Sequence, residues 1–292
     1  MTSVDLCEEV RRNCAEVARG ARWVRIDTAA LPPAGGVVGL DPGLHFLHAP
    51  VEDVARYVLV LDAINFGSGW FPTLRTGDDS PTDAITRRLT EHARARRSPW
   101  TAAELRALDA RAVAEVLDLE SAHELVGLYA QALNQLGAWL GERSALNAIA
   151  EAEGSAERFA RALASGMRFF DDRGFYKRAQ ITANDLVLAG VASFADVDRL
   201  TVFADNLVPH VLRMDGVLVY APELAAAVDR GRELPAGGAM EREIRACAVH
   251  ACEDVARRFD VAPRTLDNWL WNRGQQPPYS ERRAHLTRTV YY

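Results

Sequence analysis

Cysteine is scarce in this sequence, and its placement argues against the usual cysteine-based sites. Four cysteines occur among 292 residues: Cys7, Cys14, Cys247 and Cys252. They form two pairs whose spacings suit neighbouring or opposite helix faces rather than a metal-binding knuckle. We therefore expect buried, reduced thiols.

Long hydrophobic runs are also absent. The first residues, MTSVDLCEEVRR, carry acids and arginines where a secretory signal has a basic start and an apolar stretch. The longest apolar run, near 57–66, is interrupted by Asp62 and is too short to span a bilayer. These features predict a cytoplasmic protein with no membrane partner.

Positive charge does not dominate the chain either. The formal net charge is −6, and a negative protein repels nucleic acid in bulk. We therefore expect no stable nucleic-acid partner. A few local cations are still enough to hold a small anion such as a nucleotide phosphate.

Several well-known motifs are missing. The sequence contains no Walker loop, dinucleotide-binding glycine fingerprint, zinc-ligand spacing or hydrolase serine elbow. Phosphoryl, hydride and acyl transfer therefore have no support. We expect neither a cofactor nor a metal.

Helical periodicity dominates what is present. The chain is 49% hydrophobic and 25% charged, which is ordinary for a globular protein. Apolar residues recur at helical spacing, and only the stretches 23–27 and 216–220 look extended. We predict a mostly α fold with at most a few short strands. It would form a single domain over 1–292 or two closely packed helical halves.

Capping residues and turn formers place the predicted elements. Helix starts are marked by Pro50, by a capping box of Thr101 and Glu104, and by Pro263. We predict helices at 3–19, 50–66, 81–97, from 101 onward, and at 121–140, 155–168, 178–190, 195–213, 222–230, 240–258 and 263–274. The stretches 31–43 and 67–79, rich in glycine and proline, are predicted as loops.

One carboxylate stands out among apolar neighbours. In LTVFADNLVPHVL, Asp205 follows the aromatic Phe203 inside an otherwise apolar run. Burying an unpaired charge is costly, so this acid needs a partner or a catalytic purpose. By the pattern alone, a structural cap or ion pair is favoured about two to one over catalysis.

Three further residues suggest contacts with a nucleotide. Lys177 and Arg178 lie where a helix begins, which suits a phosphate because charge and backbone donors combine there. A solvated basic pair is the ordinary alternative. His48, just before the helix that Pro50 starts, suits a hydroxyl or phosphate contact, and a capping or core role is again the ordinary alternative.

Two aromatic segments complete the candidates. INFGSGWF, at 64–71, offers aromatic faces on a glycine-containing turn that suits stacking on a purine-like base. The segment 257–274 has the rhythm of a helix-turn-helix and is the main argument for a DNA-binding protein. Against this, nine arginines after residue 240 are nearly balanced by seven acids. Asp267 and Trp271 lie one helical turn apart, and a carboxylate beside an indole suits a guanine-like edge.

Taken together, these segments resemble the queuosine salvage protein family. The resemblance rests on LDAINFGSGW, FYKRAQITANDL, LTVFADNLVPHVL, EIRACAVHACE, LDNWLW and RTVYY, in this order. Two places depart from the pattern that we expect for the family. Gly67 and Gly69 stand where a more compact, aromatic-rich stretch is expected, and Asn272 stands where an acid is common.

The resemblance implies a helical fold similar to that of helical DNA glycosylases. It implies an enzyme, an N-glycosidase that hydrolyses queuosine 5′-phosphate to queuine and ribose 5-phosphate. It further implies Asp205 as the catalytic carboxylate. The substrate pocket would be lined by His48, Lys177, Phe203, Asp267 and Trp271.

Three alternatives stay open at this point. The pocket can belong to a nucleobase-binding protein without catalysis, or the segment 257–274 can bind DNA. A third possibility is an N-glycosidase that acts on ordinary purine nucleotides.

Overall fold

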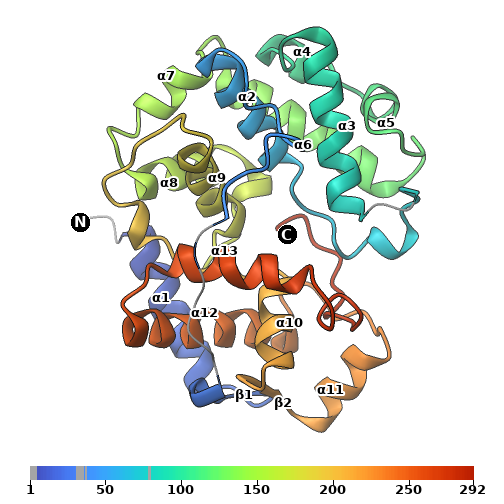
Figure 1. Cartoon of the computed structure of the whole chain (residues 1–292). Helices are drawn as coiled ribbons and strands as arrows, with labels where there is room; N and C mark the ends of the chain where they lie inside the picture. The colour runs from blue at the N-terminus through green and yellow to red at the C-terminus, as the bar shows by residue number, and fades with distance from the viewer. Residues whose placement is uncertain (1–4, 31–35, 37, 78–79) are drawn as a thin grey trace.

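The computed structural model describes residues 5–30, 36, 38–77 and 80–292. Helices dominate these residues, and the mostly α prediction is confirmed (Figure 1). The α-helices are α1 (Leu6–Arg19), α2 (Val51–Ala63), α3 (Pro81–Arg96), α4 (Ala102–Ala107), α5 (Ala110–Leu117), α6 (Glu124–Leu140), α7 (Ala145–Ala150), α8 (Ala156–Gly166), α9 (Lys177–Leu188), α10 (Leu207–Met214), α11 (Pro222–Asp229), α12 (Ala239–Phe259) and α13 (Pro263–Gly274). Short 3-10 helices are η1 (Thr28–Ala30), η2 (Phe71–Thr73), η3 (Arg168–Phe170) and η4 (Val197–Arg199).

The helices gather in two groups. Figure 1 shows α2 to α9 in its upper part and α1 with α10 to α13 in its lower part. Within the lower group α1 packs on α12 and α10 packs on α13, while α8 packs on α9 above. The red C-terminal segment runs into the middle of the molecule, between the groups.

A two-stranded sheet lies at the lower edge of the molecule. Strand β1 (Val24–Ile26) pairs antiparallel with β2 (Leu218–Tyr220), and Val24 lies opposite Tyr220. Both strands fall inside the stretches predicted as extended. The sheet ties the chain after α1 to the chain after α10.

Local capping is present at several of the predicted helix starts. The capping box at the start of α4 is present, with the Glu104 carboxylate accepting from Thr101 N–H. Asp5 caps α1 and Ser80 caps α3 through side-chain oxygens that accept backbone N–H groups. Such caps offset the unpaired donors of a first turn.

The predicted helix over 195–213 is wrong. Only η4 and α10 are helical there, and residues 200–206 are irregular. Side chains from elsewhere take the backbone donors that a helix would use. Thr201 N–H donates to Gln180 Oε1 at 2.9 Å, and Phe203 N–H donates to Asp267 Oδ1 at 2.7 Å.

Other differences are smaller. Helices α5 and α7 were not predicted, because eight and six residues are too few for an apolar period to repeat. Helix α2 stops at Ala63, short of residue 66. Of the two predicted loops, residues 31–35, 37 and 78–79 lie outside the described chain, and the rest is irregular apart from one short 3-10 helix, η2.

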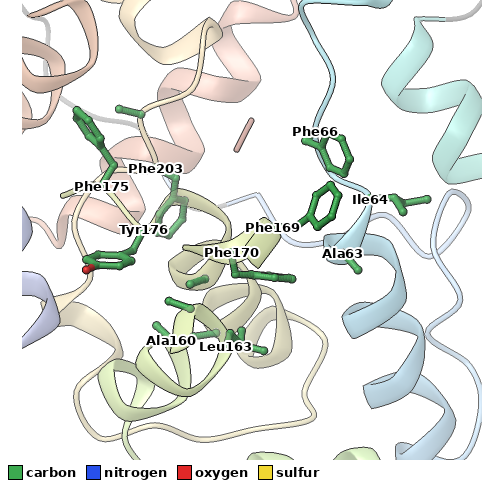
Figure 2. Close-up of a cluster of buried hydrophobic side chains, with 14 of the residues drawn as sticks. Ala63, Ile64, Phe66, Ala160, Leu163, Phe169, Phe170, Phe175, Tyr176 and Phe203 are labelled. Atoms are coloured by element: carbon green, nitrogen blue, oxygen red, sulfur yellow. The ribbon is translucent and has the colours of Figure 1, made fainter. Parts of the chain in front are cut away.

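The core is aromatic next to the middle of the molecule. Figure 2 shows Phe66, from the segment after α2, facing Phe169 of η3, and their ring centroids lie 5.6 Å apart. All four cysteines are buried and unpaired, as predicted. Among the described residues, no helix combines the length and hydropathy that crossing a membrane requires.

Candidate active site

A cavity of about 460 Å³ opens between α9, α13 and the irregular segment before α10. This volume is in the range of small-molecule sites. Five of the six predicted site residues line the cavity, although they come from three separate stretches of chain: Lys177, Phe203, Asp205, Asp267 and Trp271. Loop 38–45, the end of α2 and Tyr292 complete much of the wall.

Asp205 lies just before α10 with one carboxylate oxygen fixed and the other without a partner. Its Oδ1 accepts the backbone N–H groups of Leu207 at 2.7 Å and Val208 at 3.0 Å. Within the described chain, Oδ2 receives no hydrogen bond. The start of a helix favours negative charge. The cap therefore orients Asp205 and leaves Oδ2 for chemistry, so the structural and catalytic interpretations are compatible.

Lys177 is the first residue of α9 and the one lysine or arginine in the cavity wall of the described structure. Burial lowers the pKa of its ammonium group, and the nearby Asp205 charge opposes that shift. Its backbone N–H donates to Asp172 Oδ2 at 3.3 Å, and Asp172 is paired with Arg245. The backbone N–H of Lys177 is therefore already used, and its side chain is the part of this residue that remains for a phosphate.

Arg178 does not contribute to the cavity, contrary to the expectation that it helps to hold a phosphate. It is 1% exposed, and its guanidinium donates to the carbonyls of Asp62, Ala63, Phe169 and Val290. Its guanidinium carbon lies 4.6 Å from the ring centroid of Phe66 and 4.7 Å from that of Phe170. Arg178 is a structural residue that joins three segments of backbone.

Asp267 and Trp271 lie on one face of α13, as their spacing predicted. Asp267 is 5% exposed, and its Oδ1 accepts the N–H of Phe203. Burial, and next the charge of Asp205, raises the pKa of Asp267 to about 8. Asp267 therefore anchors the segment that carries Asp205, and its second oxygen remains for a ligand.

His48 is exposed and is not among the cavity-lining residues. The segment before Pro50 turns at residues 42–44 and again at 48–49. This arrangement brings His45 to the cavity instead, where the ring Nδ1 lies 2.9 Å from the Asp41 carbonyl oxygen. The imidazole of this segment that can reach a ligand is therefore the one three residues earlier.

Four acids of the cavity wall were not singled out as site residues in the sequence: Asp41, Asp62, Asp83 and Asp185. Helix α9 contributes a stripe to the wall: Lys177, Ile181, Asn184, Asp185 and Leu188. Burial raises the pKa of Asp185 to about 6. Asp62 of α2 is 0% exposed, and burial followed by the charge of Asp185 raises its pKa well above the ordinary value. Helical spacing from Lys177 could have identified Asp185.

The glycine-containing turn after α2 supports the cavity wall, and its aromatic rings are mostly used in packing rather than free to stack on a base. Phe66 lines the cavity but packs edge-on against Tyr129, with ring centroids 5.0 Å apart. Trp70 points elsewhere and donates from Nε1 to Glu124. A Cβ at Gly69 would lie 2.1 Å from the carbonyl oxygen of Thr287. This departure from the expected family pattern therefore makes room for the C-terminal segment.

The helix-turn-helix rhythm corresponds to α12 and α13, but the second helix is not free to enter a groove. Leu266 and Leu270 of α13 are fully buried. Arg264 pairs with Asp198 at 2.7 Å and Arg273 pairs with Asp215 at 3.0 Å. Because both cations are neutralised, the geometry favours a pocket wall over DNA binding.

One group of metal-ligating residue types lies outside the cavity lining. The ligand atoms of Asp5, Cys7 and Glu157 lie within 4.8 Å of one another. Arg199 pairs with both carboxylates, and burial raises the pKa of Cys7 to about 12. A neutral thiol and two compensated acids are a poor metal site.

Comparison with known proteins identifies relatives along most of the chain. The family model described as queuosine salvage protein matches residues 44–292. A queuosine 5′-phosphate N-glycosylase/hydrolase of Sphaerobacter thermophilus is 34% identical over 82% of each chain. Proteins of the same name from Dictyostelium discoideum and Mus musculus are 38% and 29% identical, covering 40% and 55% of this chain and 40% and 56% of their own lengths. The chain therefore belongs to the queuosine salvage protein family.

Proposed function

We propose that this chain is an N-glycosidase that hydrolyses queuosine 5′-phosphate to queuine and ribose 5-phosphate. The observation that carries the proposal is the meeting of Asp205, Lys177, Asp267 and Trp271 in one cavity. Asp205 offers a carboxylate with a free oxygen, and Lys177 offers an ammonium group. The indole of Trp271 and the carboxylate of Asp267 together form a surface that suits a nucleobase. Family membership supports the same activity, because the relatives are named for it.

The chemistry of the leaving base defines what the carboxylate must do. Queuine is a 7-deazaguanine, so position 7 is carbon and cannot be protonated in the way that activates an ordinary purine. The bond must then break through a ribose with strong oxocarbenium character. Asp205, placed near the anomeric carbon, would stabilise that charge or attack to form a ribosyl intermediate. Water then supplies hydroxide to the sugar and a proton to the base.

The remaining wall residues would bind and orient the nucleotide. Lys177 would hold the 5′-phosphate, and binding energy at this remote group would position the sugar over Asp205. Asp267 would accept hydrogen bonds from the guanine-like edge, with Trp271 and Phe203 against the ring. We propose that this hydrolysis needs no cofactor.

The decisive experiment is turnover by the purified protein and by Asp205→Asn. Asparagine keeps a side-chain acceptor for Leu207 and Val208, so the start of α10 is preserved. Mass-resolved chromatography would measure the release of free queuine. We expect release by the wild type and a rate at least about 10³-fold lower in the variant. Circular dichroism would verify that the variant is folded.

The other outcomes separate the alternatives. Queuine binding without release by the wild type would indicate a non-catalytic nucleobase-binding protein. Equal rates on guanosine 5′-phosphate would indicate a general purine nucleotide N-glycosidase. A ribose 5-phosphate adduct on Asp205 in the intact mass would assign the carboxylate as nucleophile.

We also propose that residues 1–292 act as one domain in the cytoplasm. One hydrophobic cluster includes residues of both helix groups, from Leu6 to Leu270, which supports a single domain. Four unpaired cysteines support a reducing compartment.

A further inference from the structure

Arg245 of α12 is a buried cation that does not itself line the cavity. It is 3% exposed, and its Nε–H donates to the carbonyl oxygen of Ala204 at 2.8 Å. That carbonyl belongs to the peptide bond that joins Ala204 to Asp205. One end of the guanidinium is therefore bonded directly beside the proposed catalytic carboxylate.

The other end of the guanidinium reaches Lys177 through Asp172. Nη2 of Arg245 lies 2.6 Å from Asp172 Oδ2, and the same oxygen accepts the backbone N–H of Lys177 at 3.3 Å. Three polar contacts therefore connect the backbone beside Asp205 with the backbone of Lys177. Because a guanidinium is planar and its donors point in fixed directions, this connection fixes how far apart the two backbones lie.

The orientation of the guanidinium is itself fixed by its surroundings. Nη1 donates to Asp172 Oδ1 at 3.2 Å, which makes the ion pair bidentate, and to Glu241 Oε1 at 3.4 Å. The Tyr292 hydroxyl donates to the same Glu241 oxygen at 2.9 Å. The guanidinium carbon lies 4.0 Å from the ring centroid of Phe175 and 4.6 Å from that of Tyr292. A lysine has neither the planar shape nor the set of donors to replace these contacts.

Arg178 shows what a purely structural arginine does in this fold. Its guanidinium donates to four backbone carbonyls, and none of them belongs to Lys177, to Asp205 or to the residue before either. Arg245 differs, because its two ends meet the two residues that the proposed reaction places at the phosphate and at the sugar.

We propose that Arg245 is a positioning residue that, together with Asp172, fixes the distance between the Asp205 carboxylate and the Lys177 ammonium. The inference rests on the proposed function. The 5′-phosphate and the anomeric carbon are a set number of bonds apart, so phosphate binding at Lys177 brings the sugar to Asp205 only while the two side chains keep their separation. Arg245 thereby converts phosphate binding into faster cleavage.

A double-mutant cycle tests this role. The quantity measured is kcat/KM for queuosine 5′-phosphate divided by kcat/KM for queuosine, which we call the phosphate advantage. Arg245→Lys should lower the phosphate advantage roughly 10- to 100-fold, mainly through kcat for the nucleotide, because misplacement by about 1 Å is costly. In a protein that already carries Lys177→Gln, the same change should lower it less than about threefold, because no ammonium is left to position.

The ratio distinguishes positioning from stability. A variant that merely folds less well has fewer active molecules for both substrates, so its phosphate advantage is unchanged. Arg199→Lys is the matched control, because Arg199 also pairs with two acids, Asp5 and Glu157, outside the cavity lining. An equal drop in Arg199→Lys, or additive losses for Arg245→Lys and Lys177→Gln, would overturn the proposal.

Asp172→Asn provides a second route if Arg245→Lys does not fold. Asparagine keeps an oxygen for the Lys177 N–H but removes the charge that pairs with Arg245. The phosphate advantage should again fall, and circular dichroism would verify folding. An unchanged phosphate advantage in a folded Asp172→Asn would also overturn the proposal.

The pKa of Lys177 separates this inference from the proposed activity, because it is measured without substrate. Lys177 is the only lysine in the sequence, so its side-chain 15N signal in a lysine-labelled protein is unambiguous. Burial lowers this pKa and the charge of Asp205 opposes the shift, so Asp205→Asn should lower the pKa further. In the Asp172→Asn background the same change should lower it less, because the two charges are no longer held together.

The two measurements can fail independently. A wild type that does not cleave queuosine 5′-phosphate but shows the reduced pKa response in Asp172→Asn would retain the positioning role and reject the hydrolase. Cleavage by the wild type, with the same pKa response in both backgrounds, would retain the hydrolase and reject the positioning role.

Discussion

At the scale of single residues, the partners of the buried charges separate structural from functional roles. Arg178 is fully buried with backbone carbonyls around its guanidinium, whereas the Lys177 ammonium next to it has no such set of acceptors in the described chain. A charged side chain that is hydrogen-bonded within the protein stabilises the fold. A charged side chain without such partners is available to bind a ligand. Neighbouring residues of one motif, FYKRAQ, therefore have different roles.

Lys177→Gln tests the phosphate contact. The variant should lose its preference for queuosine 5′-phosphate over queuosine, because only the nucleotide has the charge that Lys177 binds. We expect the ratio of kcat/KM for nucleotide and nucleoside to fall roughly 10- to 100-fold. If both substrates slow equally, Lys177 acts on Asp205 instead and the phosphate role is wrong.

At the scale of elements, the segment 200–206 shows what the sequence could predict and what it could not. Helix starts with local caps, such as Thr101, and the one-turn spacing of Asp267 and Trp271 could be predicted because both depend on near neighbours. The irregular backbone around Phe203 could not, because its donors are satisfied by Gln180 and Asp267, distant in the sequence. The carboxylate of Asp62, which is buried without a hydrogen-bond partner in the described chain, likewise depends on tertiary packing.

Two hydrogen bonds, which we call the latch, hold the loop before α2 against α13 and lead to a prediction. Asn268 accepts the Val38 N–H at 2.7 Å and donates to the Val38 carbonyl at 3.0 Å, while residues 38–41 line the cavity. Asn268→Ala should release this loop, with faster amide hydrogen exchange at Val38 and a KM increase of up to about tenfold. Because Asn268 shares no hydrogen bond with Asp205 in the described chain, kcat should stay within about twofold. Unchanged exchange at Val38 would rule out the latch.

At the scale of the whole molecule, buried acids and a buried histidine give opposing pH dependences of stability. The pKa of Asp267 is raised to about 8 and that of Asp185 to about 6, so the folded protein keeps protons that the unfolded chain has lost. These acids therefore make stability fall as pH rises from about 4 through their folded pKa values. Burial lowers the pKa of His285 to about 3, and its contribution to stability is lost as pH falls below about 6.5.

Comparing the wild type with Asp267→Asn isolates the contribution of Asp267 to the pH dependence of stability, because His285 is present in both proteins. Asparagine still offers Phe203 an acceptor. The wild type should lose a few degrees more in Tm than the variant between pH 5 and pH 8. Parallel Tm curves over this range would contradict the raised pKa of Asp267.

The contacts of Arg178 also impose an order on events during protein synthesis. Its guanidinium collects carbonyls at residues 62, 63 and 169, and the last of the set belongs to Val290. While translation is in progress this cation lacks an acceptor that the finished chain supplies, and the glycine turn at Gly69 has no tail to pack on. The cavity wall is therefore completed only once residues 290–292 are in place, because Tyr292 itself lines the cavity.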